Sequence, residues 1–252
     1  MAPGLPRIGF NSSALMRCLT GRAIVNAADM AQMTATPAKA AATDAKQSFA
    51  EKLGLWLDWT DAIALSAALQ TSTAVQPQRM QLGTPHTTAA VIAEVHRVRG
   101  DLTRSIRADA GLHAVALPGS APDFSPYRRS YRVQQQAMET RIGPLRRQVR
   151  ALLSGLSADL NRLAALDTVL DKALAAKERH LLSTVPSLLE KHFKRLSAQW
   201  SRSGAETSTS APGWLALFCG DMQAVLLAEL DFRLHAVDGM VDAIPNPSTR
   251  PS

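Results

Sequence analysis

Residues 126–174 read PYRRSYRVQQQAMETRIGPLRRQVRALLSGLSADLNRLAALDTVLDKAL. Apolar side chains recur in this stretch mostly at steps of three and four, which places them along one stripe of a helix. No segment alternates between apolar and polar residues as a half-buried strand would. The stretch therefore predicts long α-helix, with the stripe formed by Tyr127, Tyr131, Met138, Ile142, Leu145, Val149, Leu152, Leu156, Leu160, Leu163, Leu166, Leu170 and Leu174.

Two prolines interrupt this helical pattern. Pro144 removes one backbone donor, but the apolar stripe keeps its phase across it, so we predict a kink rather than a chain reversal. From Leu156 to Ser183 there is no Gly, Pro or turn cluster, which predicts about 40 Å of uninterrupted helix at ~1.5 Å per residue. Pro186 disfavours helical backbone at Val185, and a further helix is expected from there to Trp200.

Other helices are expected on both sides of this central segment. A short helix near residues 12–19 has Asn11, Ser12 or Ser13 as its cap, and another begins at Ser48, where Glu51 completes a capping box. Apolar residues at helical spacing predict two more, over residues 88–110 and 213–243. The first half of the last helix is apolar nearly all round and should lie centrally in a bundle.

These elements predict an all-α protein, an elongated bundle of long antiparallel helices with a proline-kinked long central helix. Residues 1–46 are expected to contain the short helix and an Ala/Thr-rich linker. Residues 47–244 would form the helical bundle domain, and residues 245–252 a flexible tail. Because 46% of the residues are apolar but 5% are aromatic, the core should be largely aliphatic.

Four stretches carry a family resemblance: SFAEKLGLWLDWTDAIALSAAL (48–69), DFSPYRRSYRVQQQAMETRIGPLRRQVRALL (123–153), LAALDTVLDKALAAKERHLLSTVPSLLEKHFKRL (163–196) and WLALFCGDMQAVLLAELDFRLHAVDGMVDAI (214–244). In these stretches the chain resembles an uncharacterised proteobacterial family known only as a domain of unknown function. The resemblance implies no catalytic or cofactor residue. It does imply an association with an envelope machine, because similar proteins are encoded near proton-channel and peptidoglycan-binding components.

The net charge of +7 comes from one part of the chain. Between residues 95 and 150 there are 11 Arg and 4 acidic residues, so this segment carries 11 − 4 = +7, and the remaining 17 basic and 17 acidic residues cancel. Three interpretations remain open. The arginines pair internally, for example with the acidic last helix, or they bind an acidic partner protein, or they bind nucleic acid. Tyr127 and Tyr131 lie on the apolar stripe, which argues against exposed stacking platforms.

No catalytic or metal-binding pattern stands out. The six histidines are scattered without metal-ligand spacing, and His180 and His192 lie beside basic residues, which predicts solvated side chains. Asp167 and Asp171 share a helix face and could act as an acid–base pair, although an exposed helical face is the favoured interpretation. There is no nucleophile, phosphate-loop or dinucleotide motif. We therefore expect no enzyme activity, no metal and no cofactor.

The sequence also bears on the compartment. Cys18 and Cys219 lie in apolar contexts, which predicts free thiols in a reducing environment. The most apolar segment, residues 214–227, contains Asp221 and is shorter than the roughly 20 residues of a membrane span. The N-terminal residues lack the apolar core of a secretory signal. A cytoplasmic protein without a transmembrane segment is expected.

The function predicted from these observations is a non-catalytic interaction or assembly protein with a basic helical surface. Its partner would be an acidic protein or the chain's own acidic C-terminal helix, and a homo-oligomer is a further possibility. The alternative is nucleic-acid binding through the Arg-rich region 95–150. The candidate partner-binding residues are Arg128, Arg129, Arg132, Arg141, Arg146, Arg147 and Arg150.

Overall fold

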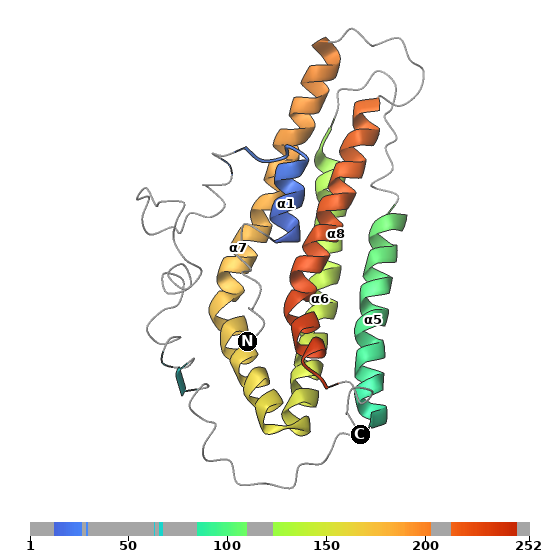
Figure 1. Cartoon of the computed structure of the whole chain (residues 1–252). Helices are drawn as coiled ribbons and strands as arrows, with labels where there is room; N and C mark the ends of the chain where they lie inside the picture. The colour runs from blue at the N-terminus through green and yellow to red at the C-terminus, as the bar shows by residue number, and fades with distance from the viewer. Residues whose placement is uncertain are drawn as a thin grey trace, which may run out of the picture. The chain divides into compact units, whose positions relative to one another are not determined.

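The computed structural model describes residues 13–26, 29, 63, 66–67, 85–109, 123–202 and 213–245. Within these residues the chain forms five helices and no strand, so the predicted all-α class is confirmed (Figure 1). The helices are α1 (Ala14–Gly21), α5 (Pro85–Ala108), α6 (Ser125–Leu156), α7 (Ala158–Arg202) and α8 (Gly213–Asp242). Four predicted features lie outside the described residues: the Ala/Thr-rich linker, the domain boundary at residue 46, the capping box at Ser48 and most of the tail.

The chain divides into two compact units, and each unit combines segments that are distant in the sequence. Unit 1 contains Met1–Phe49, Leu102–Met138 and Arg179–Phe232, and unit 2 contains Ala50–Asp101, Glu139–Glu178 and Arg233–Ser252. Each of the four longer helices therefore contributes one segment to each unit. The predicted division ran consecutively along the chain and did not include this pattern.

Helix α1 belongs to unit 1 and has well-defined ends. Ser13 caps its start, because the Ser13 hydroxyl accepts a hydrogen bond from the Met16 N–H at 3.3 Å. At its end the Ile24 N–H donates to the Leu19 carbonyl and the Ala23 N–H donates to the Thr20 carbonyl, the pattern of a Schellman motif. Ala23 occupies the left-handed position of this motif, with φ of 51°. The predicted short helix and one of its three candidate caps are thus confirmed.

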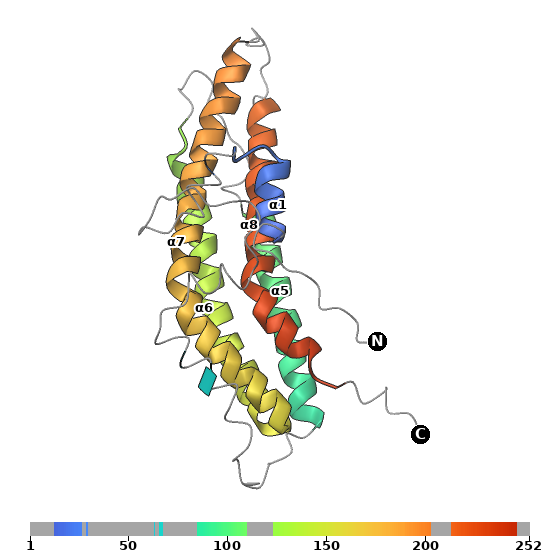
Figure 2. The same cartoon turned by 60° about the vertical axis from the view of Figure 1, so that its left-hand side comes forward.

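A chain reversal at Ser157 was not predicted. Helix α6 ends at Leu156 and α7 begins at Ala158, and the two helices meet at this turn in Figure 2. Ser157 caps α7, because its hydroxyl accepts the Leu160 N–H at 3.2 Å and its carbonyl accepts the Asn161 N–H at 2.9 Å. The prediction of uninterrupted helix across residue 156 is wrong at this point, since one serine suffices for the turn. Helix α6 does continue through Pro144, and the kink there stays a prediction.

The helix boundary predicted at Pro186 is also wrong, because α7 continues through it. Proline has no N–H, so the carbonyl of Leu182 lacks its usual partner four residues later. The side chain of Gln135, on α6, supplies the missing donor: its Nε2 lies 3.1 Å from the Leu182 carbonyl oxygen. The Thr184 hydroxyl likewise donates to the Leu181 carbonyl at 2.7 Å. Tertiary and side-chain donors therefore stabilise helical backbone that the local sequence disfavours.

This compensation predicts an energetic coupling between Gln135 and Pro186. Replacing Gln135 by Ala should lower the free energy of unfolding by about 1–3 kcal/mol, because it removes the donor that the Leu182 carbonyl receives in place of the proline N–H. In a Pro186→Ala background the restored N–H can serve the Leu182 carbonyl, so the same replacement should cost about 1 kcal/mol less. Urea unfolding of the two single variants and the double variant measures this difference. Additive effects would contradict the role we assign to Gln135.

Aromatic side chains from α6, α7 and α8 form much of the core of unit 1. The ring centroid of Phe218 lies 5.0 Å from that of Phe193, 5.4 Å from that of Tyr127 and 6.0 Å from that of Phe124. These spacings and their edge-on arrangements are the ones that aromatic pairs favour. Tyr127 is 8% exposed, so its predicted place in the core is confirmed and it offers no stacking platform.

The core of unit 2 is aliphatic. It is built from apolar stripes of α5, α6 and α8 together with the start of α7. The buried side chains include Val91, Val95, Val98, Ile142, Leu145, Val149, Leu160, Leu234 and Val237. The stripe predicted for α6 is therefore correct, because its members are buried from Tyr127 to Leu152. Its continuation in α7 from Leu163 to Leu174 is half-buried.

Candidate partner-binding surface

The seven candidate arginines fall into two groups in the structure. Four of them form ion pairs within their own unit: Arg128 with Glu190, Arg141 with Asp101, Arg146 with Asp167 and Asp171, and Arg150 with the same two aspartates. The other three, Arg129, Arg132 and Arg147, are exposed, and the described residues offer them no ion pair. Four of the seven predicted partner-binding arginines are therefore engaged by carboxylates of the chain itself.

Arg146 and Arg150 brace unit 2. The Arg146 guanidinium lies 2.6 Å from Asp167 and 2.8 Å from Asp171, and the Arg150 Nε lies 2.9 Å from Asp167. The side chains of both arginines are 15–16% exposed and that of Asp167 is 9% exposed. Two positive and two negative charges thus neutralise one another between α6 and α7. Arg146 and Arg150, both predicted as partner-binding residues, are therefore engaged in ion pairs within unit 2.

Asp167 and Asp171 consequently occupy a different environment from either one predicted. The side chain of Asp167 is 9% exposed and that of Asp171 is 37% exposed, so the predicted exposed face does not hold for Asp167, and each carboxylate is held by guanidinium groups. The spacing offers a signal that sequence reasoning could have used. Arg146 and Arg150 are four residues apart, as are Asp167 and Asp171, so the pairs match face to face once the chain reverses at Ser157.

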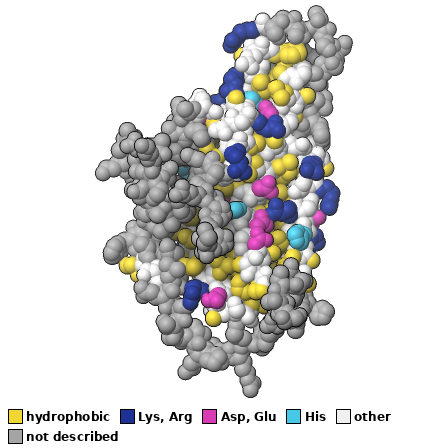
Figure 3. Space-filling model, viewed as in Figure 1, with side chains coloured by type: hydrophobic (Ala, Val, Ile, Leu, Met, Phe, Trp, Pro, Cys, Tyr) yellow, Lys and Arg dark blue, Asp and Glu magenta, His cyan; other side chains and the backbone are white. Residues whose placement is uncertain are grey.

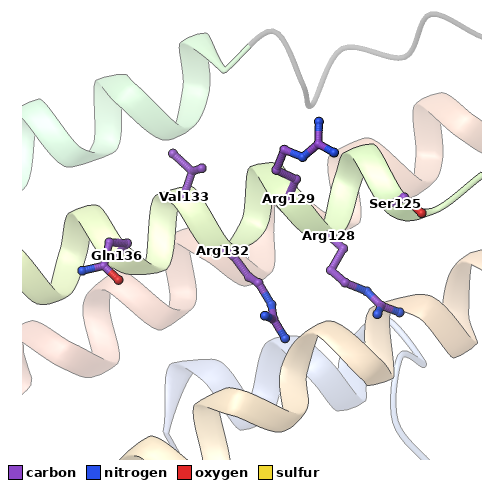
Figure 4. Close-up of a pocket in the computed structure, with 6 residues that line it drawn as sticks. All are labelled: Ser125, Arg128, Arg129, Arg132, Val133 and Gln136. Carbon is purple, nitrogen blue, oxygen red and sulfur yellow. The ribbon is translucent and has the colours of Figure 1, made fainter.

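The exposed arginines of unit 1 line a shallow, open hollow on α6. Its lining residues recur at helical spacing along one face, and its volume is about 420 Å³. Figure 4 shows Arg128 and Arg132 along one edge of this face and Arg129 and Val133 along the other. Val133 is 59% exposed. The lining comprises Ser125, Arg128, Arg129, Arg132, Val133 and Gln136, and we call this set the α6 hollow.

The electrostatics of the α6 hollow favour a negatively charged ligand. Its lining contains three arginines and no acidic residue. Glu190 of α7 pairs with Arg128 and also with Lys194, whose Nζ lies 2.8 Å from the carboxylate. These two cations, Lys194 foremost, lower the pKa of Glu190. Counting Arg128, Arg129, Arg132 and Lys194 against Glu190, the local charge is 4 − 1 = +3.

The predicted pairing of basic helices with the acidic last helix is found for some residues and not for others. In unit 2, Arg99 binds Asp238 at 2.5 Å. In unit 1, Glu229 accepts hydrogen bonds from the Tyr131 hydroxyl at 2.6 Å and from Gln135 at 3.0 Å. The face drawn in Figure 3 also shows basic side chains beside acidic ones. Among the contacts of the described residues, Arg128 pairs with α7 rather than α8.

His192 corrects another prediction. The sequence suggested a solvated histidine, but the side chain is 3% exposed and its Nε2 lies 2.8 Å from Asp221. Burial is the main cause that lowers the pKa of His192, while Asp221 opposes this effect and Arg195 adds to it. Asp221 is 29 residues away on α8, so no local pattern indicates the contact. His180, by contrast, is exposed as predicted.

Neither a metal site nor a membrane span is found within the described part of the chain. No three His, Cys, Asp or Glu side chains gather there in a way that could hold a metal ion. None of the described helices combines the length and the apolar character needed to cross a membrane. Cys18 and Cys219 are thiols rather than disulfide partners, as predicted, and Cys219 is buried.

Residues 1–246 match a protein family described as "Protein of unknown function (DUF3348)". The chain belongs to this family. The predicted resemblance to a family known only as a domain of unknown function is thus confirmed, and its proteobacterial range stays a prediction. No curated protein and no solved structure matches the chain. Because the DUF3348 description specifies no activity, a function for this member has to be argued from its own geometry.

Proposed function

We propose that this chain is a non-catalytic interaction or assembly protein that binds an acidic partner protein through the α6 hollow. The observation that carries the proposal is the exposure of Arg129 and Arg132 beside Val133, without an ion pair in the described residues. Interfaces commonly combine arginines with apolar side chains, because guanidinium groups bind carboxylates while the apolar surface is removed from water. An acidic helix that also carries apolar residues would satisfy both features.

Charge reversal at Arg129 and Arg132 tests this proposal. The probe is a fluorescent synthetic peptide designed as a helix, with Glu and Leu residues each repeating at steps of three and four. Its binding is followed by fluorescence anisotropy. We expect the Arg129→Glu/Arg132→Glu variant to bind the peptide at least about tenfold more weakly, since like charges then oppose each other. Its unfolding free energy should change by less than about 0.5 kcal/mol per site, because both side chains are exposed.

A charge-matched control is available at Arg107 and Arg147, which are also exposed, form no ion pair within the described residues and, although Arg147 was a predicted partner-binding residue, do not line the α6 hollow. The Arg107→Glu/Arg147→Glu variant has the same net charge as the test variant and should retain most of the peptide affinity. Equal losses in the two variants would show that net charge, rather than the α6 hollow, drives binding. In that case the proposed surface is wrong.

Nucleic-acid binding through the same arginines is the competing proposal, and Val133 separates the two. Replacing Val133 by Ser should weaken peptide binding, because it removes apolar contact area, and should leave duplex DNA binding unchanged. If DNA is the true ligand, its affinity must fall with salt at a log–log slope of about −0.9 per phosphate neutralised. Salt-dependent DNA binding without peptide binding would replace the protein-partner proposal.

A further inference from the structure

Helix α1 is fastened to unit 1 by apolar packing and by polar contacts at its C-terminal end. Leu15, Met16 and Leu19 are at most 1% exposed. Arg22, at the C-cap, lies 2.5 Å from the Asp221 carboxylate on α8. The next residue, Ala23, accepts a hydrogen bond at its carbonyl from the Arg195 guanidinium on α7.

His192 lies between Asp221 and Arg195, the two residues that make these polar contacts with the end of α1. Its own contacts determine its protonation state. Its Nδ1 is 2.7 Å from an Arg195 nitrogen. Because arginine can donate but cannot accept a hydrogen bond, Nδ1 must be the acceptor. The ring proton therefore sits on Nε2 and is donated to Asp221, 2.8 Å away. Both ring nitrogens of a neutral imidazole are thus occupied.

The charged groups around this imidazole come from each element packed against it. Helix α7 contributes Arg195 and Lys191, helix α8 contributes Asp221, and α1 contributes Arg22. Asp29, which follows α1, pairs with Lys191 at 2.6 Å. Cys18 of α1 contacts Arg22, and burial of this thiol raises its pKa. The ring of Phe218 closes the apolar side, with its centroid 6.1 Å from that of His192.

We propose that His192 is a proton-operated latch that holds α1 on unit 1 when neutral and releases it when protonated. A proton taken from solvent would bind Nδ1, the acceptor of the Arg195 hydrogen bond. Arg195 would then lose that acceptor and face a second positive charge. The same Arg195 nitrogen holds the Ala23 carbonyl, so this contact weakens as well. The imidazolium would also compete with Arg22 for Asp221.

The direction of the pH effect follows from the two states of His192. Burial lowers the pKa of His192 in the docked state, and Arg195 adds to this effect. Once α1 is released, the histidine titrates near its ordinary value of about 6.5. The released state therefore binds more protons, so docking is strongest above that value and weakens as the pH falls through it.

Hydrogen exchange of the full chain tests the latch. After correction for intrinsic exchange rates, the opening equilibrium of residues 14–21 should increase by up to about tenfold between pH 7.5 and pH 5.5, the limit for a histidine that titrates near 6.5 in the released state and stays neutral in the docked state. In a His192→Gln variant, which cannot titrate, this increase should disappear. His180→Gln is the matched control, because His180 is an exposed histidine on the same helix, and it should keep the increase.

Three outcomes would overturn the proposal. The first is α1 protection that does not change with pH in the unmodified chain. The second is an equal loss of protection at pH 5.5 in the His192→Gln variant, which would assign the effect to carboxylates such as Asp221. The third is measured on the unmodified chain, from nitrogen chemical shifts of labelled histidine. The proposal requires the Nε2–H tautomer of His192 and a protonation that coincides with the opening of α1, and a different result in either would overturn it. A tautomer with the proton on Nδ1 would refute the latch even if His192→Gln fails to fold.

Discussion

Phe218→Ala is expected to lower the free energy of unfolding by about 3–5 kcal/mol, because it removes a large buried ring and leaves a cavity. Phe218 is 0% exposed and its ring meets those of Phe124, Tyr127 and Phe193. These partners come from α7, from the start of α6 and from Phe124 directly before it, so the cavity cannot collapse without moving helices that pack against α8. Urea unfolding followed by far-UV circular dichroism measures the loss.

The neighbouring residue provides the control. Leu217 precedes Phe218 on α8 and is 55% exposed, so Leu217→Ala should change the unfolding free energy by less than about 0.5 kcal/mol. Both variants remove apolar side-chain atoms from the same turn of the same helix, and they differ in which way the side chain faces. Similar losses for the two would mean that the face of α8 assigned to the core is wrong.

A second large effect is expected in unit 2. Asp167→Ala should destabilise the protein by about 3 kcal/mol, because it leaves the largely buried guanidinium groups of Arg146 and Arg150 without their main partner. The side chains of these arginines are 16% and 15% exposed, and Asp171, which is 37% exposed, offers only partial compensation. Breaking one side of a buried ion-pair network costs more than the net contribution of the intact network, since the remaining charges stay desolvated.

Asp159 is the matched carboxylate on the same helix. Its side chain is 91% exposed and lies 3.8 Å from Arg162. Asp159→Ala should therefore cost about 0.5 kcal/mol, mostly through the loss of a negative charge in the first turn of α7. The test compares the unfolding free energies of the two variants, measured in the same buffer. If Asp167→Ala is as mild as Asp159→Ala, the network does not brace α6 against α7.

Helix positions could be predicted closely where an apolar stripe was regular and where capping or helix-breaking residues marked the ends of the helix. The last helix was expected over residues 213–243 and is observed as Gly213–Asp242. Residue Ser13 was among the three expected caps of the first helix and is the one used. In both cases the residues that interact lie within a few positions of one another in the sequence. Sequence periodicity and capping patterns report such local interactions directly.

Predictions failed where an interaction between distant segments decides the structure, or where helical neighbours conceal a single capping residue. Helical backbone at Pro186 depends on a hydrogen bond from Gln135, which lies 47 residues earlier in the chain. The reversal at Ser157 needs one capping residue, and the helical propensity of its neighbours conceals it. The Arg146 and Arg150 network becomes visible only once that reversal brings α7 beside α6.

The sequence by itself determined that this chain is helical, that one stripe of residues 126–152 is buried and that the positive charge is concentrated in residues 95–150. Tertiary structure alone decided which of those charges remain available. Periodicity fixes the angle at which a side chain leaves its own helix, but not which helix lies opposite. For this reason Arg146 and Arg150 became a buried brace, His192 became a buried hydrogen-bonded group, and Arg129 and Arg132 were left exposed on the α6 hollow.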